Sequence, residues 1–147
     1  MQNFKHILVP TDFHQASAAA LDLAVAMAQA FDAKVTLLHV WELPVYPYMD
    51  FMLNSSLISQ VEDAAVKGLA QGLETLQKRL PNAQSKLKTG LPWQGVLEAI
   101  KELDADLVIM GTHGRRGLSR LTLGSVAERV VRLASVPVLT VHSPSEA

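Results

Sequence analysis

The sequence predicts an α/β fold, an open doubly wound sheet of five parallel strands with four helices on its two faces. Short apolar and β-branched segments alternate with segments of helical periodicity, in the order βαβαβαβαβ. Each helical segment is long enough to cross over and bring the next strand in parallel. The length of 147 residues suits one core, and no repeat or linker divides the chain, so we expect a single domain over residues 1–147.

The expected strands are short and differ in polarity. Residues 6–10 (HILVP), 34–41 (KVTLLHVW) and 106–110 (DLVIM) are largely apolar, which is typical of strands buried on both faces. Residues 83–89 (AQSKLKT) alternate and carry lysines that would be costly between two helical layers, so this strand should lie at an edge. Residues 136–142 (VPVLTVH) form the fifth strand.

Four segments with apolar residues at three- and four-residue steps are expected to be helices. They cover residues 16–31, residues 56–80, a segment that opens with Pro92, and residues 125–134. Residues 42–55 contain two prolines and no sustained period, which indicates one long connection.

Two of these helices have an unusual composition. The alanine-rich first helix is interrupted by Asp22 and Gln29 and is too short for a membrane span, so we expect it to face the core. The second helix contains Gly68 and Gly72, which lower helix propensity. A closely packed or bent helix would explain them.

Composition removes several classes of function. The formal net charge of −1 gives no general attraction to nucleic acid or to an anionic membrane, and neither is expected as a partner. The absence of cysteine excludes disulfides, thiolate zinc sites and cysteine nucleophiles, and the five histidines lack metal-ligand spacing. The N-terminus runs into the first strand without a secretory signal, so the expected location is the cytoplasm.

Half of the eight glycines fall between the fourth strand and the last helix, at Gly111, Gly114, Gly117 and Gly124. Ligands of open α/β sheets bind beyond the carboxyl ends of the strands, where a glycine loop lets backbone N–H groups approach phosphate oxygens. The alternative is that these glycines only make a tight turn. A dinucleotide motif of the GxGxxG type after the first strand and a Walker-type loop are both absent.

The start of the last helix adds to the anion-binding character of this loop. Ser125 and Glu128 match a capping box, which predicts a helix beginning at Ser125 with unpaired amides at Gly124, Ser125 and Val126. Arg115 and the other arginines of the loop have no acidic residue among them, so an anion is the expected ligand unless they form only a solvated face.

Two motifs resemble the universal stress protein family. Gly111-x2-Gly114-x9-Gly124-Ser125, which follows DLVIMGTHG and leads to PVLTV, closely resembles the nucleotide-binding motif of its ATP-binding branch. The opening ILVPTD, which ends at Asp12, is similar to the first strand of that family. The resemblance runs from about residue 5 to residue 141.

The resemblance implies a Rossmann-like sheet with strand order 3-2-1-4-5 and a site for ATP, together with Mg²⁺. Asp12 and the backbone of Val40 would hold the adenosine part, and Gly111 would lie under the ribose. The phosphates would contact Gly114, Gly124, Ser125 and Val126. The remaining expected contacts are Pro10, Thr11, Met110, His113 and Arg115.

Several roles stay open at this point. Asp12 could hold Mg²⁺ through water, or serve only as a turn or N-cap residue before the first helix. Family resemblance implies a homodimer through the edge strand, residues 136–141. The leading hypothesis is a regulatory ATP-binding protein of the stress response. The alternatives are a slow ATPase or nucleotidyl-transfer enzyme, for which the sequence offers no nucleophile, and a ligand-free interaction module.

Overall fold

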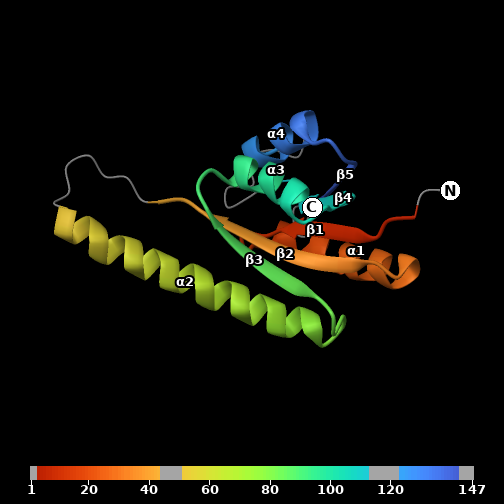
Figure 1. Cartoon of the computed structure of the whole chain (residues 1–147), viewed down its shortest axis with the longest axis horizontal. Coiled ribbons are helices and arrows are strands. Elements are labelled where there is room, and N and C mark those ends of the chain that lie inside the picture. Colours follow the sequence, from red (N-terminus) through yellow and green to blue (C-terminus); the bar gives the residue numbers. More distant parts are fainter. Residues whose placement is uncertain (1–2, 44–50, 113–122, 143–147) are drawn as a thin grey trace.

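The computed structural model describes residues 3–43, 51–112 and 123–142, with the side chains of 51–54 excepted. Five strands form one sheet, and every neighbouring pair is parallel. The strands are β1 (His6–Pro10), β2 (Lys34–Trp41), β3 (Gln84–Thr89), β4 (Leu107–Gly111) and β5 (Val138–Val141). Their order, β3-β2-β1-β4-β5, is the one that the resemblance implied (Figure 1).

Helices cover both faces of the sheet, as a doubly wound fold requires. They are α1 (Gln15–Phe31), α2 (Phe51–Gln77), α3 (Pro92–Glu102) and α4 (Ser125–Leu133). Residues of α1 and α2 pack with one face of the strands, and residues of α3 and α4 pack with the other. In Figure 1, α3 and α4 lie at the top of the view, and α2 runs along the bottom.

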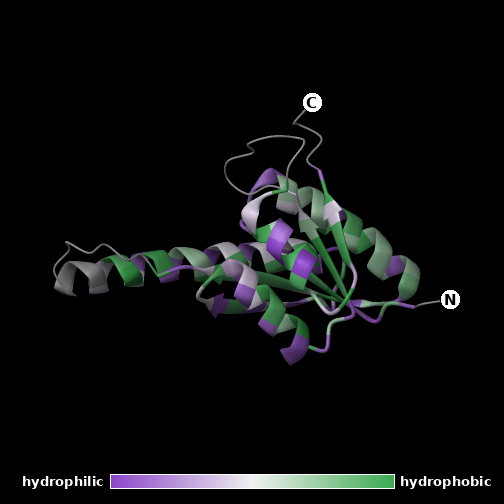
Figure 2. Ribbon diagram, turned by 90° about the horizontal axis from the view of Figure 1, so that it is seen from above, coloured by the Kyte–Doolittle hydropathy of each residue, from purple (hydrophilic) through white to green (hydrophobic). Residues whose placement is uncertain are grey.

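The core follows the two-residue alternation of the strands. Ile7 and Val9 of β1 face α1 and α2, whereas Leu8, between them, faces α3 and α4, and all three are fully buried. Ala24 and Ala28 of α1 are buried against the first of these faces, which confirms the expected core-facing helix. Figure 2 shows the hydrophobic colour running along the central strands.

The largest boundary difference concerns α2. Residues 51–55 were expected to belong to the long connection, but the helix already begins at Phe51, because no helix breaker follows Pro47. At its other end α2 stops at Gln77 rather than residue 80, ahead of Pro81, which disfavours helical backbone in the residue before it. Figure 1 shows the first turns of α2 extending past the sheet.

Smaller corrections affect the last two strands. β4 runs one residue further than expected because Gly111 pairs with Val141. β5 begins only after Pro137, which has no N–H to donate. Across the described ranges, no helix combines the length and the apolar character needed to cross a bilayer.

Candidate functional site

A cavity of about 690 Å³ opens at the carboxyl ends of the central strands. β1 and β4 are neighbours there, but the chain leaves β1 toward α1 on one face and reaches α4 on the other face after β4. Such a switch point leaves a crevice between the two connections, which is where open α/β sheets bind ligands.

Most of the residues predicted for the site meet in this cavity. They come from the ends of β1, β2 and β4 and from the start of α4, which are far apart in the sequence. Those that line it are Pro10, Thr11, Asp12, Val40, Met110, Gly111, Gly124, Ser125 and Val126. The other three, His113, Gly114 and Arg115, lie outside the described residues.

Asp12 is fixed by two local hydrogen bonds. Its Oδ1 accepts the backbone N–H of His14 at 3.0 Å and the hydroxyl of Ser17 at 2.9 Å. The N-cap of α1 is His14, so Asp12 is a turn residue rather than the helix cap that remained an alternative. The carboxylate is half-buried at the cavity wall, and these bonds hold its orientation.

A histidine of β2 supports the loop that carries Asp12. Nδ1 of His39 lies 2.8 Å from the carbonyl oxygen of Thr11, which can only accept, so Nδ1 carries the proton. The ring of Phe13 packs on the same imidazole with 4.4 Å between centroids. Both rings line the cavity, although the sequence analysis did not assign either residue to the site. The signal in the sequence that could have pointed to Phe13 and His39 is that they are the direct neighbours of Asp12 and Val40, which were predicted for the site.

The glycine loop is closed by a backbone contact at its base. The N–H of Gly124 donates to the carbonyl oxygen of Thr112 at 2.7 Å, so the prediction of an unpaired amide at Gly124 is wrong. The first amides of an α-helix have no acceptor within the helix, which leaves those of Ser125 and Val126 at the cavity wall.

The helix begins at Ser125 as predicted, but not through a capping box. Gly124 is the N-cap residue, and no side-chain cap hydrogen bond forms. The carboxylate of Glu128 instead lies 3.2 Å from the guanidinium of Arg132. Ser125 is therefore the first residue of the helix rather than its cap.

Close packing around two glycines brings one helix from each face of the sheet toward the cavity. A Cβ at Gly111 would lie 2.7 Å from Cβ of Ala16, so α1 approaches the end of β4 only because that position has no side chain. A Cβ at Gly95 would lie 2.6 Å from a methyl of Val40, which brings α3 against the end of β2 in the same way. Gly111 thus has a packing role whether or not a ligand binds.

The second helix forms a wall of the cavity that was not predicted from the sequence. Val61, Ala64 and Ala65 of α2 line the cavity, beside Trp41 at the end of β2. Glu42 adds a second carboxylate to that of Asp12. These contributions depend on where α2 packs, which residue periodicity does not specify.

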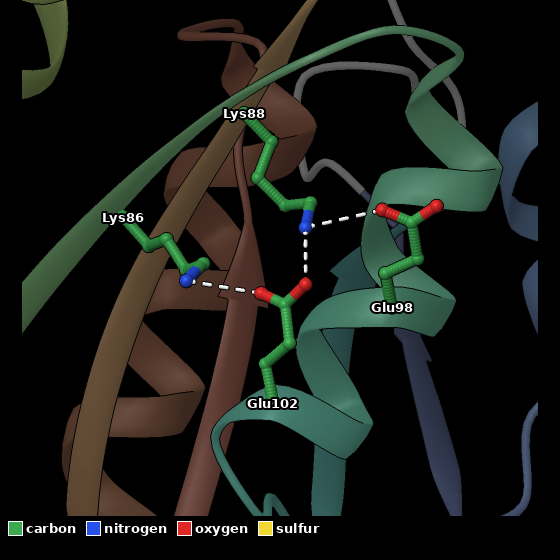
Figure 3. A network of polar contacts seen from close by, with 4 residues as sticks. All are labelled: Lys86, Lys88, Glu98 and Glu102. Carbon is green, nitrogen blue, oxygen red and sulfur yellow. Dashed lines mark hydrogen bonds and ion pairs between the residues drawn. The ribbon is translucent and has the colours of Figure 1, made fainter.

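A charged network joins the edge strand β3 to α3 (Figure 3). Nζ of Lys88 lies 2.7 Å from Glu102 and 3.1 Å from Glu98, and Lys86 lies 3.0 Å from Glu102. The hydrogen bond to Glu102 raises the pKa of Lys88, and the same bond lowers the pKa of Glu102. The network holds α3, whose Pro92 and Val96 line the cavity.

Metal-binding residues do not gather in the part of the chain that the structure describes. No three histidine, aspartate or glutamate side chains within it come together as ligands of one ion would.

Fold and cavity define an α/β protein with a ligand crevice at the switch point of its sheet. The model of the universal stress protein family matches residues 3–142, and the chain belongs to this family. Universal stress protein MJ0531 of Methanocaldococcus jannaschii is 33% identical to it, over 97% of this chain and 85% of that protein.

Solved structures of the family share the fold. Universal stress protein UspA from Lactobacillus plantarum superposes with a TM-score of 0.83 at 27% identity, covering 96% of this chain and 99% of that one. A family protein from Arabidopsis thaliana, solved with AMP bound, has a TM-score of 0.69 at 19% identity, covering 97% and 94% of the two chains.

Proposed function

We propose that this protein binds ATP in the cavity at the switch point and that nucleotide occupancy regulates its part in a stress response. One observation carries the proposal. Strand ends and a helix start that are distant in sequence converge on one cavity, and they supply nine of the twelve residues predicted for a nucleotide. The AMP-bound relative with the same fold supports an adenine nucleotide as the ligand.

The start of α4 suits the phosphates. The amides of Ser125 and Val126 stand at the positive end of the helix dipole, where anions are stabilised. In the proposal, His113, Gly114 and Arg115 make the remaining contacts with the phosphates.

The other end of the cavity suits the adenosine part. In the proposal the adenine lies at the end of β2 beside Val40, and the ribose lies over Gly111 next to Asp12. The cavity volume of about 690 Å³ falls within the range of small-molecule sites.

Mg²⁺ would accompany the phosphates and would contact the protein through Asp12. Since Oδ1 of Asp12 already accepts two hydrogen bonds, its other oxygen is left for a water bound to the metal. This donor set fits Mg²⁺, which keeps several waters and is held mainly by substrate phosphates. The ion would neutralise phosphate charge.

Titration calorimetry with ATP, ADP and AMP, with and without Mg²⁺, tests the proposal. The Gly124→Asp variant places a carboxylate at the phosphate end of the cavity and should bind ATP far more weakly than the wild type does. Its affinity for AMP should fall less, because AMP carries fewer phosphates. The Asp12→Asn variant keeps the Oδ1 acceptor and removes the charge. If it loses affinity for nucleotide only in the presence of Mg²⁺, Asp12 contacts the metal. No binding of any of the three at millimolar concentration would overturn the proposal.

A second candidate function is slow hydrolysis of the bound nucleotide. The observation that favours it is Glu42, a second carboxylate that lines the cavity together with Asp12. Release of inorganic phosphate by the wild type should then exceed that of Glu42→Gln and of Gly124→Asp. Equal rates in all three proteins would exclude hydrolysis and leave binding alone.

We also propose a homodimer through β5. This strand is the last of the sheet, and Leu139 on it is exposed. Val131 and Leu133 of α4, the helix that precedes β5, are exposed as well. An uncovered apolar edge strand favours pairing with a second copy.

A further inference from the structure

Phe13 has a backbone conformation that is unusual for its residue type. Its φ of 67° is in the left-handed region. The other described non-glycine residues with positive φ are Asp32 and Asp104, and aspartate tolerates this region much better than a bulky aromatic residue does. Such a conformation persists only where the surrounding contacts enforce it, and it often occurs at functional sites.

Three contacts hold Phe13 in this conformation. Its N–H donates to Oγ1 of Thr11 at 2.9 Å. Its ring packs on His39, tilted by 43°. The edge of the ring lies against Gly68 of α2, where an added Cβ would be only 3.0 Å from Cε2 of Phe13. The ring therefore occupies the space next to Gly68, which is open because α2 has no side chain at position 68. We call this space the seat of the ring.

The seat lies next to the functional residues of the cavity. Phe13 directly follows Asp12, and His39 directly precedes Val40, so a change in the backbone of Phe13 would act directly on its neighbour Asp12. The same helix lines the cavity with Val61 and Ala65. In addition to these direct contacts of α2, the side chain of Phe13 connects the position of α2 with the cavity.

We propose that Phe13 is a positioning residue of the ligand site, and that α2 sets its position through the side-chain-free seat at Gly68. The inference rests on the proposed nucleotide site. It makes α2 the element that responds to occupancy, because any coupling between ligand and helix acts equally in both directions.

The chain offers a matched pair of variants. Gly68→Ala and Gly72→Ala lie one turn apart on α2, are both half-buried, and bring the same gain in helix propensity. Each added methyl would meet a neighbour at 3.0 Å, but the neighbour is the Phe13 ring at position 68 and a methyl of Leu37 at position 72. Leu37 belongs to the core and does not line the cavity.

Nucleotide affinity should separate the two variants. We expect Gly68→Ala to bind ADP at least about fivefold more weakly than Gly72→Ala, the lower end of typical coupling effects, while their thermal midpoints stay similar. In a Phe13→Leu background the smaller side chain no longer reaches the seat, so Gly68→Ala should have little further effect. Equal affinities of the two alanine variants, or an undiminished effect of Gly68→Ala in the Phe13→Leu background, would overturn the inference.

Hydrogen exchange without nucleotide separates this inference from the proposed function. Amides of residues 12–17 should exchange faster in Gly68→Ala than in Gly72→Ala, whether or not ADP binds. If wild-type protein binds no nucleotide and this difference is still seen, the nucleotide site fails while the positioning role of Phe13 stands. If exchange is the same in both variants, the positioning role fails.

Discussion

The backbone N–H of Gly124 and the carbonyl oxygen of Thr112 are joined by a 2.7 Å hydrogen bond that closes the loop between β4 and α4. Thr112 is itself tied to the sheet, because its N–H donates to Val141 at 3.0 Å, and the residue is buried. The next residue after Gly124 begins α4. The sheet thereby determines where the first amides of α4 stand.

Removing this hydrogen bond should destabilise the protein. Gly124 has a φ of −62°, which proline can adopt, but Gly124→Pro has no N–H to donate to the buried Thr112. We expect a loss of about 1–3 kcal/mol in unfolding free energy, measured by urea denaturation. Gly124→Ala keeps the N–H and is the control, so equal stability of the two variants would contradict the role given to this bond.

Fluorescence should report nucleotide binding through one tryptophan. Trp41 lines the cavity and is 7% exposed, whereas Trp93 packs under the guanidinium of Arg129, 5.1 Å from its ring centroid, and does not line the cavity. Emission should change on titration with ADP in the wild type and in Trp93→Phe, and the change should be lost in Trp41→Phe. A signal that survives in Trp41→Phe and disappears in Trp93→Phe would place the ligand elsewhere.

The network on β3 and α3 predicts a pH dependence of stability. Since hydrogen bonds from Lys88 and Lys86 lower the pKa of Glu102 below its ordinary value of 4.5, the ionised carboxylate is favoured by folding. Its contribution is complete above the ordinary value and is lost as the pH falls through the lower folded value. Glu102→Gln should therefore be less stable than wild type at neutral pH, and the difference should shrink near pH 3.

Urea midpoints at the two pH values provide the measurement. Glu74→Gln, at an exposed carboxylate of α2 outside the network, is the matched control and should differ little from wild type at either pH. A difference between wild type and Glu102→Gln that stays constant from neutral to acidic pH would show that the network does not act through ionisation of Glu102.

Dimer formation should depend on the outer face of β5. Leu139 is 37% exposed, and Leu139→Lys would place a charge on the proposed pairing edge. Light scattering should then give a dimer for wild type at micromolar concentration and a monomer for the variant. Val66→Lys, at a similarly exposed apolar residue of α2, should stay dimeric. A monomeric wild type would refute the proposed interface.

Regular local patterns explain why much of the fold could be predicted. Burial on both faces makes strands such as residues 6–10 and 106–110 nearly continuous apolar runs, and Pro92 indicates the start of α3, so these elements were located within a residue or two. Strand order was not contained in these patterns; it came from the family resemblance, and the structure agrees with it.

Boundaries and hydrogen bonds that depend on distant partners were predicted less well. Phe51 lies in a segment that looked like a loop, and the amide predicted to be free at Gly124 is taken up by Thr112. The capping box at Ser125 has the right residue types, yet Glu128 pairs with Arg132 instead. Each of these outcomes is a competition between local preference and a partner that only the folded chain supplies.

The amino-acid sequence alone therefore determined the alternation of strands and helices and the glycine loop before the last helix, because periodicity, proline and glycine act over a few neighbouring positions. Nine of the residues at the crevice were expected in advance, through the family resemblance. Only the tertiary structure decided that Phe13 rests on Gly68, that His39 supports the loop of Asp12, and that α2 lines the cavity. These contacts join segments brought together by packing, and packing geometry depends on the shapes of all the side chains between the layers at once.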